Sequence, residues 1–171
     1  IVKQDPNDEP AYKQLERIAT EKQQLIKDGK IKKQKPLPPI TDEEKPFELP
    51  KGWEFSCLQD ITLLITDGKH GDCNNLENSG YFFLSAKDIK NGKLVYDNAR
   101  QIASSEFAEV HQRTNLEHGD ICMVNTGATV GKMAIVEDIQ FTRKTTIQKS
   151  IAVINEAKEN TNNKYLTLFI Q

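Results

Sequence analysis

The sequence predicts a mixed α/β domain of the α+β type, in which several short strands follow a helical arm. Its prolines are unevenly placed: all seven lie within residues 1–50, whereas eight of the nine glycines lie within residues 51–171. A proline-rich segment beside a proline-free one is typical of an arm and linker followed by a compact domain. The proline-free part holds short apolar runs that do not alternate regularly with helices, which favours a mixed arrangement over repeated βαβ units.

Residues 1–29 are interpreted as the helical arm, with a helix over residues 11–28. Apolar residues recur there at helical spacing and form a narrow stripe, while the other faces are charged. An isolated helix of this length is marginal in water, so the stripe must pack on something in this chain or another, and a partner helix is expected. Gly29 suits the left-handed position that ends a helix. The residues expected in this packing are Leu15, Ile18 and Leu25.

Residues 30–50 are interpreted as a linker that is basic at first and then rich in proline and acidic residues. The lysines near its start could contact phosphate. They also suit a solvated helix end, where cations complement the helix dipole, and this second interpretation is favoured. These lysines are Lys27, Lys30, Lys32, Lys33 and Lys35.

The compact domain is predicted over residues 51–160 and consists of short apolar runs separated by turns. Strands are expected where β-branched and aromatic residues cluster, and glycine or Asn-Gly marks the turns between them. Trp53, Phe82 and Phe83 are expected in the core. The expected strands are 53–55, 61–66, 81–85, 121–124, 132–136 and 150–154, and a short helix is expected over 105–113.

The two ends of the sequence indicate a fragment or a trimmed chain. It opens at Ile1 without a methionine, and residues 161–171 have the pattern of a helix that the end of the chain cuts short. We therefore expect the first turns of a longer helix at the C-terminal end.

Composition excludes several classes of protein. The chain has 23 Lys and Arg against 25 Asp and Glu, a net charge of -2, so any DNA-binding charge must be local or supplied by a partner. No apolar run approaches the ~20 residues of a membrane span. The three cysteines cannot all pair and include no C-x-x-C, which argues for a reducing, cytoplasmic setting and against a zinc ribbon.

Motifs of catalysis are not matched. The run TGATVGKM at 126–133 is one residue short of a phosphate-binding loop, and Met133 stands where that loop needs a hydroxyl for Mg²⁺. The histidines form no H-E-x-x-H motif, and no Gly-x-Ser-x-Gly elbow is present. We therefore expect no cofactor, no metal ion and no catalysis by this chain, and we interpret the glycines of 127–131 as a hairpin turn.

An ordered series of phrases resembles the DNA-specificity subunit of type I restriction–modification enzymes. Each phrase is weak by itself, but the series covers essentially the whole chain. The leading phrases are DPNDEP at 5–10, LIKDGKIKKQKPLPPI at 25–40 and FELPKGWEF at 47–55. The later ones are LQDI at 58–61, ITDGKHG at 65–71, FLSAKDIKNG at 83–92, GDI at 119–121 and GATVGK at 127–132.

The resemblance implies one target recognition domain, with the N-terminal one of two favoured. Such a domain is a globular α/β unit around a twisted sheet, and it reads one half of a split target in double-stranded DNA. The subunit itself does no chemistry. It holds methyltransferase subunits and, through them, the ATP-driven restriction subunits, and it is a cytoplasmic protein with no membrane partner.

Two stretches offer the side chains that DNA recognition needs. Lys and Arg suit guanine or phosphate, whereas Asn and Gln suit adenine. The loop over 66–79 and the acid-free stretch over 141–149 combine both kinds. The candidate contacts are Lys69, His70, Asn74 and Asn75 in the first, and Arg143, Lys144, Thr145, Thr146, Gln148 and Lys149 in the second.

Two other classes stay open from the residues themselves. The chain could be a non-catalytic protein-interaction module that docks through the helix at 11–28. It could also be a fragment of a nuclease or methyltransferase, although the motif search makes this the weakest of the three.

Overall fold

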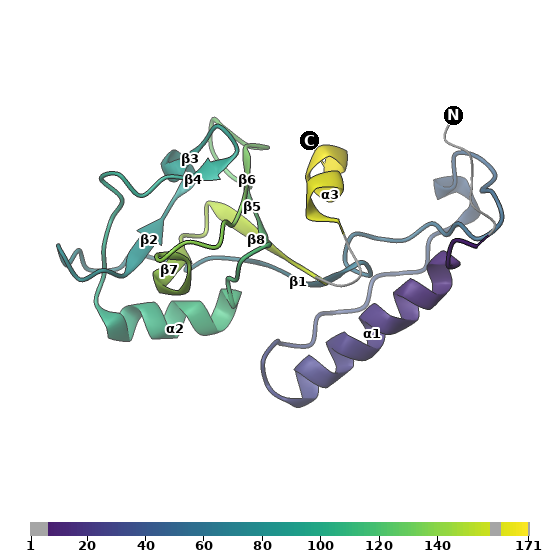
Figure 1. Ribbon diagram of the computed structural model, residues 1–171, viewed down its shortest axis with the longest axis horizontal. Helices are drawn as coiled ribbons and strands as arrows, with labels where there is room; N and C mark the ends of the chain where they lie inside the picture. Colours follow the sequence, from purple (N-terminus) through teal and green to yellow (C-terminus); the bar gives the residue numbers. More distant parts are fainter. Residues whose placement is uncertain (1–6, 158–161, 171) are drawn as a thin grey trace.

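The mixed α/β class is confirmed by the computed structural model, which describes residues 7–157 and 162–170 (Figure 1). Its helices are α1 (Ala11–Lys27), α2 (Ser104–Thr114) and α3 (Asn163–Ile170), with short 3₁₀ turns η1 (Asp42–Glu44), η2 (Ala86–Asp88) and η3 (Thr142–Lys144). Its strands are β1 (Thr62–Asp67), β2 (Phe82–Leu84), β3 (Ile89–Lys90), β4 (Lys93–Leu94), β5 (Ile121–Val124), β6 (Met133–Ile135), β7 (Thr145–Ile147) and β8 (Ile151–Glu156).

Strand pairing gives one larger sheet and two small ones. The larger sheet has four strands in the order β1-β8-β5-β6, all antiparallel. β2 pairs with β7 in parallel, and β3 with β4 in an antiparallel hairpin. Asn91 and Gly92 close that hairpin with φ angles of 51° and 74°, the paired left-handed conformation that this tight turn requires. The glycines of 127–131 lie in the turn between β5 and β6, as the sequence predicted.

The expectation of a strand at 53–55 is wrong. The Trp53 backbone N–H donates to the carbonyl of Pro50 in a turn, and the Trp53 side chain is 59% exposed rather than in the core. Phe82 and Phe83 are buried, as expected. The sequence does not predict β7, because its two threonines are also typical of a polar loop.

The apolar core forms three clusters that link the sheets and helices. The largest lies between the small sheets and the four-stranded sheet and includes Leu84, Ile147 and Val153. A second lies beneath α2, around Phe83 and Val110. The third packs α3 against the far side of the four-stranded sheet. β7 and α2 are in contact, so the region of the predicted DNA contacts rests on buried structure.

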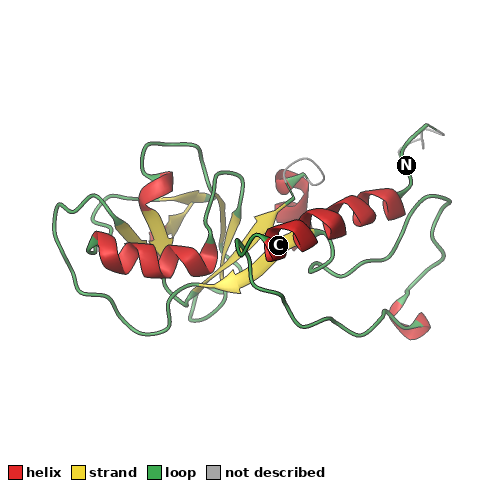
Figure 2. Ribbon diagram, turned by 90° about the horizontal axis from the view of Figure 1, so that it is seen from below, coloured by secondary structure: helices red, strands yellow, loops and turns green. Residues whose placement is uncertain are grey.

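Helix α1 packs on its own chain. Ile18 is fully buried, whereas Leu15 and Leu25 are half-buried, and α1 contacts β1. The linker turns back beside α1, as Figure 1 shows, and η1 lies at the outer end of this part in Figure 2. Ile18 is therefore not available to a separate partner helix, which corrects the expectation for that residue.

Specific hydrogen bonds fix the arm. The first N–H of α1, on Ala11, donates to the Gly52 carbonyl at 2.8 Å. Lys22 interrupts the apolar stripe because its ammonium donates to the Gln59 carbonyl at 2.5 Å, and burial lowers the pKa of this lysine. Gly29 has a φ of 70°, and the N–H of Lys30 reaches back to the Leu25 carbonyl, which is the glycine-dependent helix end expected here.

Two further expectations concern a helix near the C-terminal end and the absence of a membrane-spanning segment. The helix of 164–170 is confirmed as α3, while residues 161 and 171 lie outside the described residues. No helix within 7–157 or 162–170 is long and apolar enough to cross a membrane.

The three thiols should differ sharply in reactivity. Cys73 and Cys122 are 3% and 0% exposed, and burial raises the pKa of both thiols, whereas Cys57 is half-buried. We expect a thiol reagent to label one cysteine per native chain rapidly, and all three after denaturation. A Cys57→Ser variant should lose the rapid phase. Rapid labelling that persists in this variant would contradict the packing around Cys73 or Cys122.

Candidate nucleic-acid interface

The two stretches predicted to contact DNA meet in space. At the end of β1 the Lys69 backbone N–H donates to the Ile147 carbonyl at 3.0 Å, and the Lys69 carbonyl accepts from the Lys149 N–H at 3.1 Å. Lys69 and Gln148 form an isolated parallel bridge. Residues far apart in the sequence thus place Lys69, His70, Gln148 and Lys149 side by side.

Gly68 makes this meeting possible. A Cβ atom added to it would lie 2.0 Å from the Ile147 carbonyl oxygen and 2.6 Å from the Gln148 carbonyl carbon. Both are backbone atoms, so neither can move aside as a flexible side chain would. Glycine is required here because of close approach between two chain segments.

Asp67 is the charged centre of the junction. Its carboxylate accepts a hydrogen bond from the Arg113 guanidinium and a second one, at 2.5 Å, from His70 Nε2, while Arg113 Nε donates to the Asp67 carbonyl at 3.0 Å. Partial burial raises the pKa of Asp67, but the hydrogen bonds from Arg113 and His70 outweigh burial, so the pKa lies below its usual value. Asp67 is therefore ionised at neutral pH.

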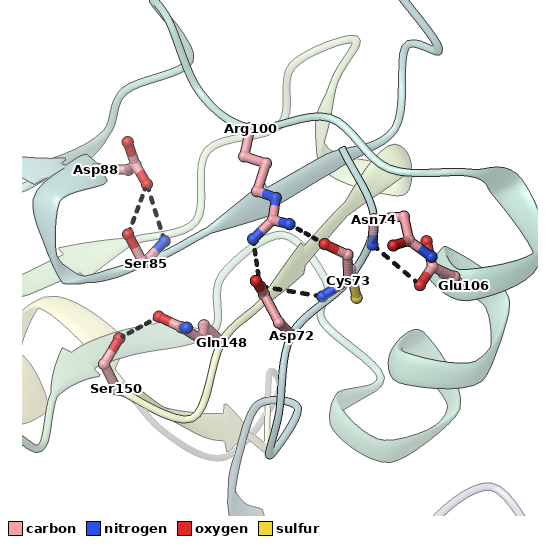
Figure 3. A network of polar contacts seen from close by, with 9 residues as sticks. All are labelled: Asp72, Cys73, Asn74, Ser85, Asp88, Arg100, Glu106, Gln148 and Ser150. Carbon is pink, nitrogen blue, oxygen red and sulfur yellow. Dashed lines mark hydrogen bonds and ion pairs between the residues drawn. The ribbon is translucent and has the colours of Figure 1, made fainter. Parts of the chain in front are cut away.

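The following loop is held against α2 and the segment before it, as Figure 3 shows. Arg100 binds the Asp72 carboxylate and the Cys73 carbonyl, and the Cys73 side chain is buried. The Asn74 backbone N–H donates to Glu106 at 3.2 Å. The side chains of Asn74 and Asn75 are exposed on this anchored loop.

One face of α2 contacts residues 67–74 through three side chains, one on each successive turn of the helix. Glu106 accepts from Asn74, Glu109 pairs with the Lys69 ammonium at 3.6 Å, and Arg113 binds Asp67. Their spacing of i, i+3 and i+7 puts the three side chains on one side of a helix. α2 is thus the support on which the predicted contacts of the first stretch are arranged.

The second stretch divides into exposed and buried residues. Arg143 and Lys144 are exposed in η3, and the Lys144 ammonium lies 5.7 Å from the centre of the Tyr81 ring. Tyr81 in turn packs on Phe107 of α2, with ring centres 4.9 Å apart. Arg143 and Lys144 therefore lie near the first half of α2, whereas Lys69 lies near its second half.

Thr145 and Thr146 must be removed from the candidate contacts. Both are 0% exposed because β7 is covered, and the Thr145 hydroxyl donates to the Phe141 carbonyl at 2.7 Å. Sequence reasoning treated them as loop residues, since threonine suits both a polar loop and a buried strand.

Sequence reasoning also missed Arg100 and Arg113. Neither belongs to a motif, and both act across long sequence separations, on Asp72 and Asp67 respectively. The one sequence signal was an arginine in the last turn of a predicted helix, which is too common to single out. No group of three or more His, Cys, Asp or Glu side chains suited to a metal ion occurs within the described residues.

Comparison with known proteins supports the resemblance to specificity subunits. The chain is 72% identical over 61 residues to the type I restriction enzyme EcoAI specificity subunit of Escherichia coli, and this stretch is 36% of the chain and 10% of that relative. It is 55% identical over 74 residues to the EcoEI specificity subunit of the same organism, a stretch that is 43% of the chain and 12% of the relative. No family model matches the chain.

These matches confirm the resemblance to type I specificity subunits. Both relatives are named as specificity subunits of type I restriction enzymes. The matched stretches span only about a tenth of each relative's length.

Replacing Gly68 tests the junction. We expect Gly68→Ala to lower the free energy of unfolding by about 3 kcal/mol, because the methyl group would overlap backbone atoms. Gly29→Ala is the control: Gly29 has a φ of 70°, which Gly68 does not share, and nothing lies within 4 Å of an added Cβ, so the cost of about 1 kcal/mol comes from backbone conformation alone. Denaturant unfolding of both variants measures the difference. Equal costs would show that the close approach at Gly68 does not exist.

Proposed function

We propose that this chain reads double-stranded DNA as a target recognition domain of a type I restriction–modification specificity subunit. The observation that carries the proposal is the junction of the two candidate stretches beside α2. It gathers cationic and amide side chains on anchored backbone, which is what base readout and phosphate positioning require. The proposed contacts are Lys69, His70, Asn74, Asn75, Arg143, Lys144, Gln148 and Lys149.

The charge of the chain fits a reader that works within a complex. A net charge of -2 does not favour general DNA binding, and the cations among the proposed contacts are local: Lys69, Arg143, Lys144 and Lys149. We propose that the chain reads one half of a split target and that methyltransferase subunits supply further phosphate contacts, with restriction subunits bound through them. The isolated chain should then bind DNA weakly.

A docking role has support from α3. Tyr165, Leu168 and Phe169 are 69%, 73% and 77% exposed, although Leu166 on the same helix is buried against the sheet. An exposed apolar helix face of this kind suits packing against another helix. This observation fits docking as one part of a specificity subunit, and it also fits a protein-interaction module. The interaction module, however, does not explain why cationic and amide side chains are grouped beside α2.

Replacing the two cations of η3 tests the DNA-binding proposal. In the assembled specificity–methyltransferase complex, Arg143→Ala with Lys144→Ala should weaken DNA binding and reduce the slope of log affinity against log salt by about 2 units, since each lost phosphate contact removes about one. The measurement is DNA affinity over a series of salt concentrations.

The matched control is a second pair of lysines. Lys32→Ala with Lys33→Ala removes the same amount of charge from exposed positions in the linker, where we expect solvated side chains. This pair should leave the slope unchanged. A reduced slope in the linker variant, together with an unchanged slope in the η3 variant, would show that DNA binds at the linker and not beside α2.

A further inference from the structure

The turn that presents Lys69 and His70 is held from one side by a single arginine. Arg113 reaches Asp67 with two groups: its terminal nitrogen binds the carboxylate, and its Nε donates to the backbone carbonyl at 3.0 Å. The other carboxylate oxygen of Asp67 is bound to His70. Arg113 therefore connects α2 to the conformation of residues 67–70 at both the main chain and the side chain.

The geometry requires the long, forked side chain of arginine. Two nitrogens of one guanidinium act on two different groups of Asp67, a side-chain carboxylate and a main-chain oxygen. A lysine offers one point charge and cannot reproduce this arrangement. Asp67 is about one-quarter exposed and ionised, so loss of Arg113 would leave its charge paired with His70 alone among the partners described here.

The guanidinium of Arg113 is bound to Asp67, so we do not count it among the side chains that contact DNA. Its side chain is 47% exposed, yet its polar contacts point inward to β1. His70 is 61% exposed and its ring is bound to Asp67, whereas Lys69 is 21% exposed and its ammonium is paired with Glu109 at 3.6 Å. Lys69 and His70 can each reach a ligand by giving up a side-chain partner, whereas Arg113 contacts both the main chain and the side chain of the turn from which they project.

We propose that Arg113 is a positioning residue for DNA recognition, acting through Asp67 on Lys69 and His70. The inference rests on the proposed function. A residue that works in this way affects affinity only as long as the side chains that it positions are present, so its effect must vanish when they are removed.

A double-mutant cycle in the assembled complex tests this dependence. Arg113→Ala should weaken DNA binding by about tenfold, and Arg113→Lys should restore little of the loss. In a Lys69→Ala, His70→Ala background, Arg113→Ala should change affinity less than twofold and leave the salt slope unchanged. An additional tenfold loss in that background, with a smaller slope, would mean that Arg113 contacts phosphate itself and would overturn the proposal.

A second background separates positioning from a general loss of stability. In an Arg143→Ala, Lys144→Ala background, Arg113→Ala should still weaken binding by about tenfold, because those cations are not held by Arg113. A general folding defect would give the same loss in both backgrounds and would also overturn the proposal. Gln112→Ala, at the exposed neighbouring position on α2, should leave affinity unchanged.

Failure of the wider proposal would look different. If the parent complex binds DNA but Lys69→Ala with His70→Ala has no effect, the DNA face is elsewhere and both proposals fall. If that pair weakens binding and the effect of Arg113→Ala is multiplicative, the DNA face stands and only the role of Arg113 falls.

Discussion

The architecture of the candidate site depends on one close approach between backbones. Gly68 lies so near the carbonyl of Ile147 that no side chain fits between them, and the adjacent hydrogen bonds of Lys69 to Ile147 and Lys149 become possible because of it. This contact joins the end of an edge strand of the large sheet to the end of β7 in a small one. It turns two stretches about 80 residues apart into one surface, and the buried cores on either side of β7 keep that surface in place.

Charge is arranged on this surface so that one face of α2 supplies partners to the first stretch. Glu106, Glu109 and Arg113 meet Asn74, Lys69 and Asp67 from one helical face. The Lys69–Glu109 pair joins a lysine that is 21% exposed to a glutamate that is 72% exposed, at 3.6 Å. A solvent-accessible pair of this length contributes little to stability, commonly below about 1 kcal/mol, so it can be exchanged for a contact with a ligand at small cost. The contact between Arg113 and the partly buried Asp67 is less easily exchanged, because Arg113 also donates a hydrogen bond to the backbone carbonyl of Asp67. The surface therefore combines a fixed turn with side chains that are free to change partners.

Much of this fold could be predicted from the sequence, since short β-branched runs and glycine turns report local structure. β1, β5, β6 and β8, the turn at Asn91-Gly92 and the helix end at Gly29 follow from such local signals. The failures have a shared physical cause. Thr145 and Thr146 are polar in composition but buried by α2 and β2, and Trp53 is apolar but lies exposed beside a turn. The periodicity around Ile18 predicts a partner helix in this chain or another, because periodicity shows that a face is apolar but not what covers it. Arg113 could not be found because its partner lies 46 residues away.

Hydrogen exchange of the assembled complex, with and without its target DNA, tests the central claim most directly. A single recognition surface built on the Gly68 junction predicts that amides of 67–75 and of 148–149 become protected together on addition of target DNA, while those of α1 are unchanged. Protection confined to α1 and the lysines after it, with the junction unaffected, would show that this surface is not where the chain meets DNA.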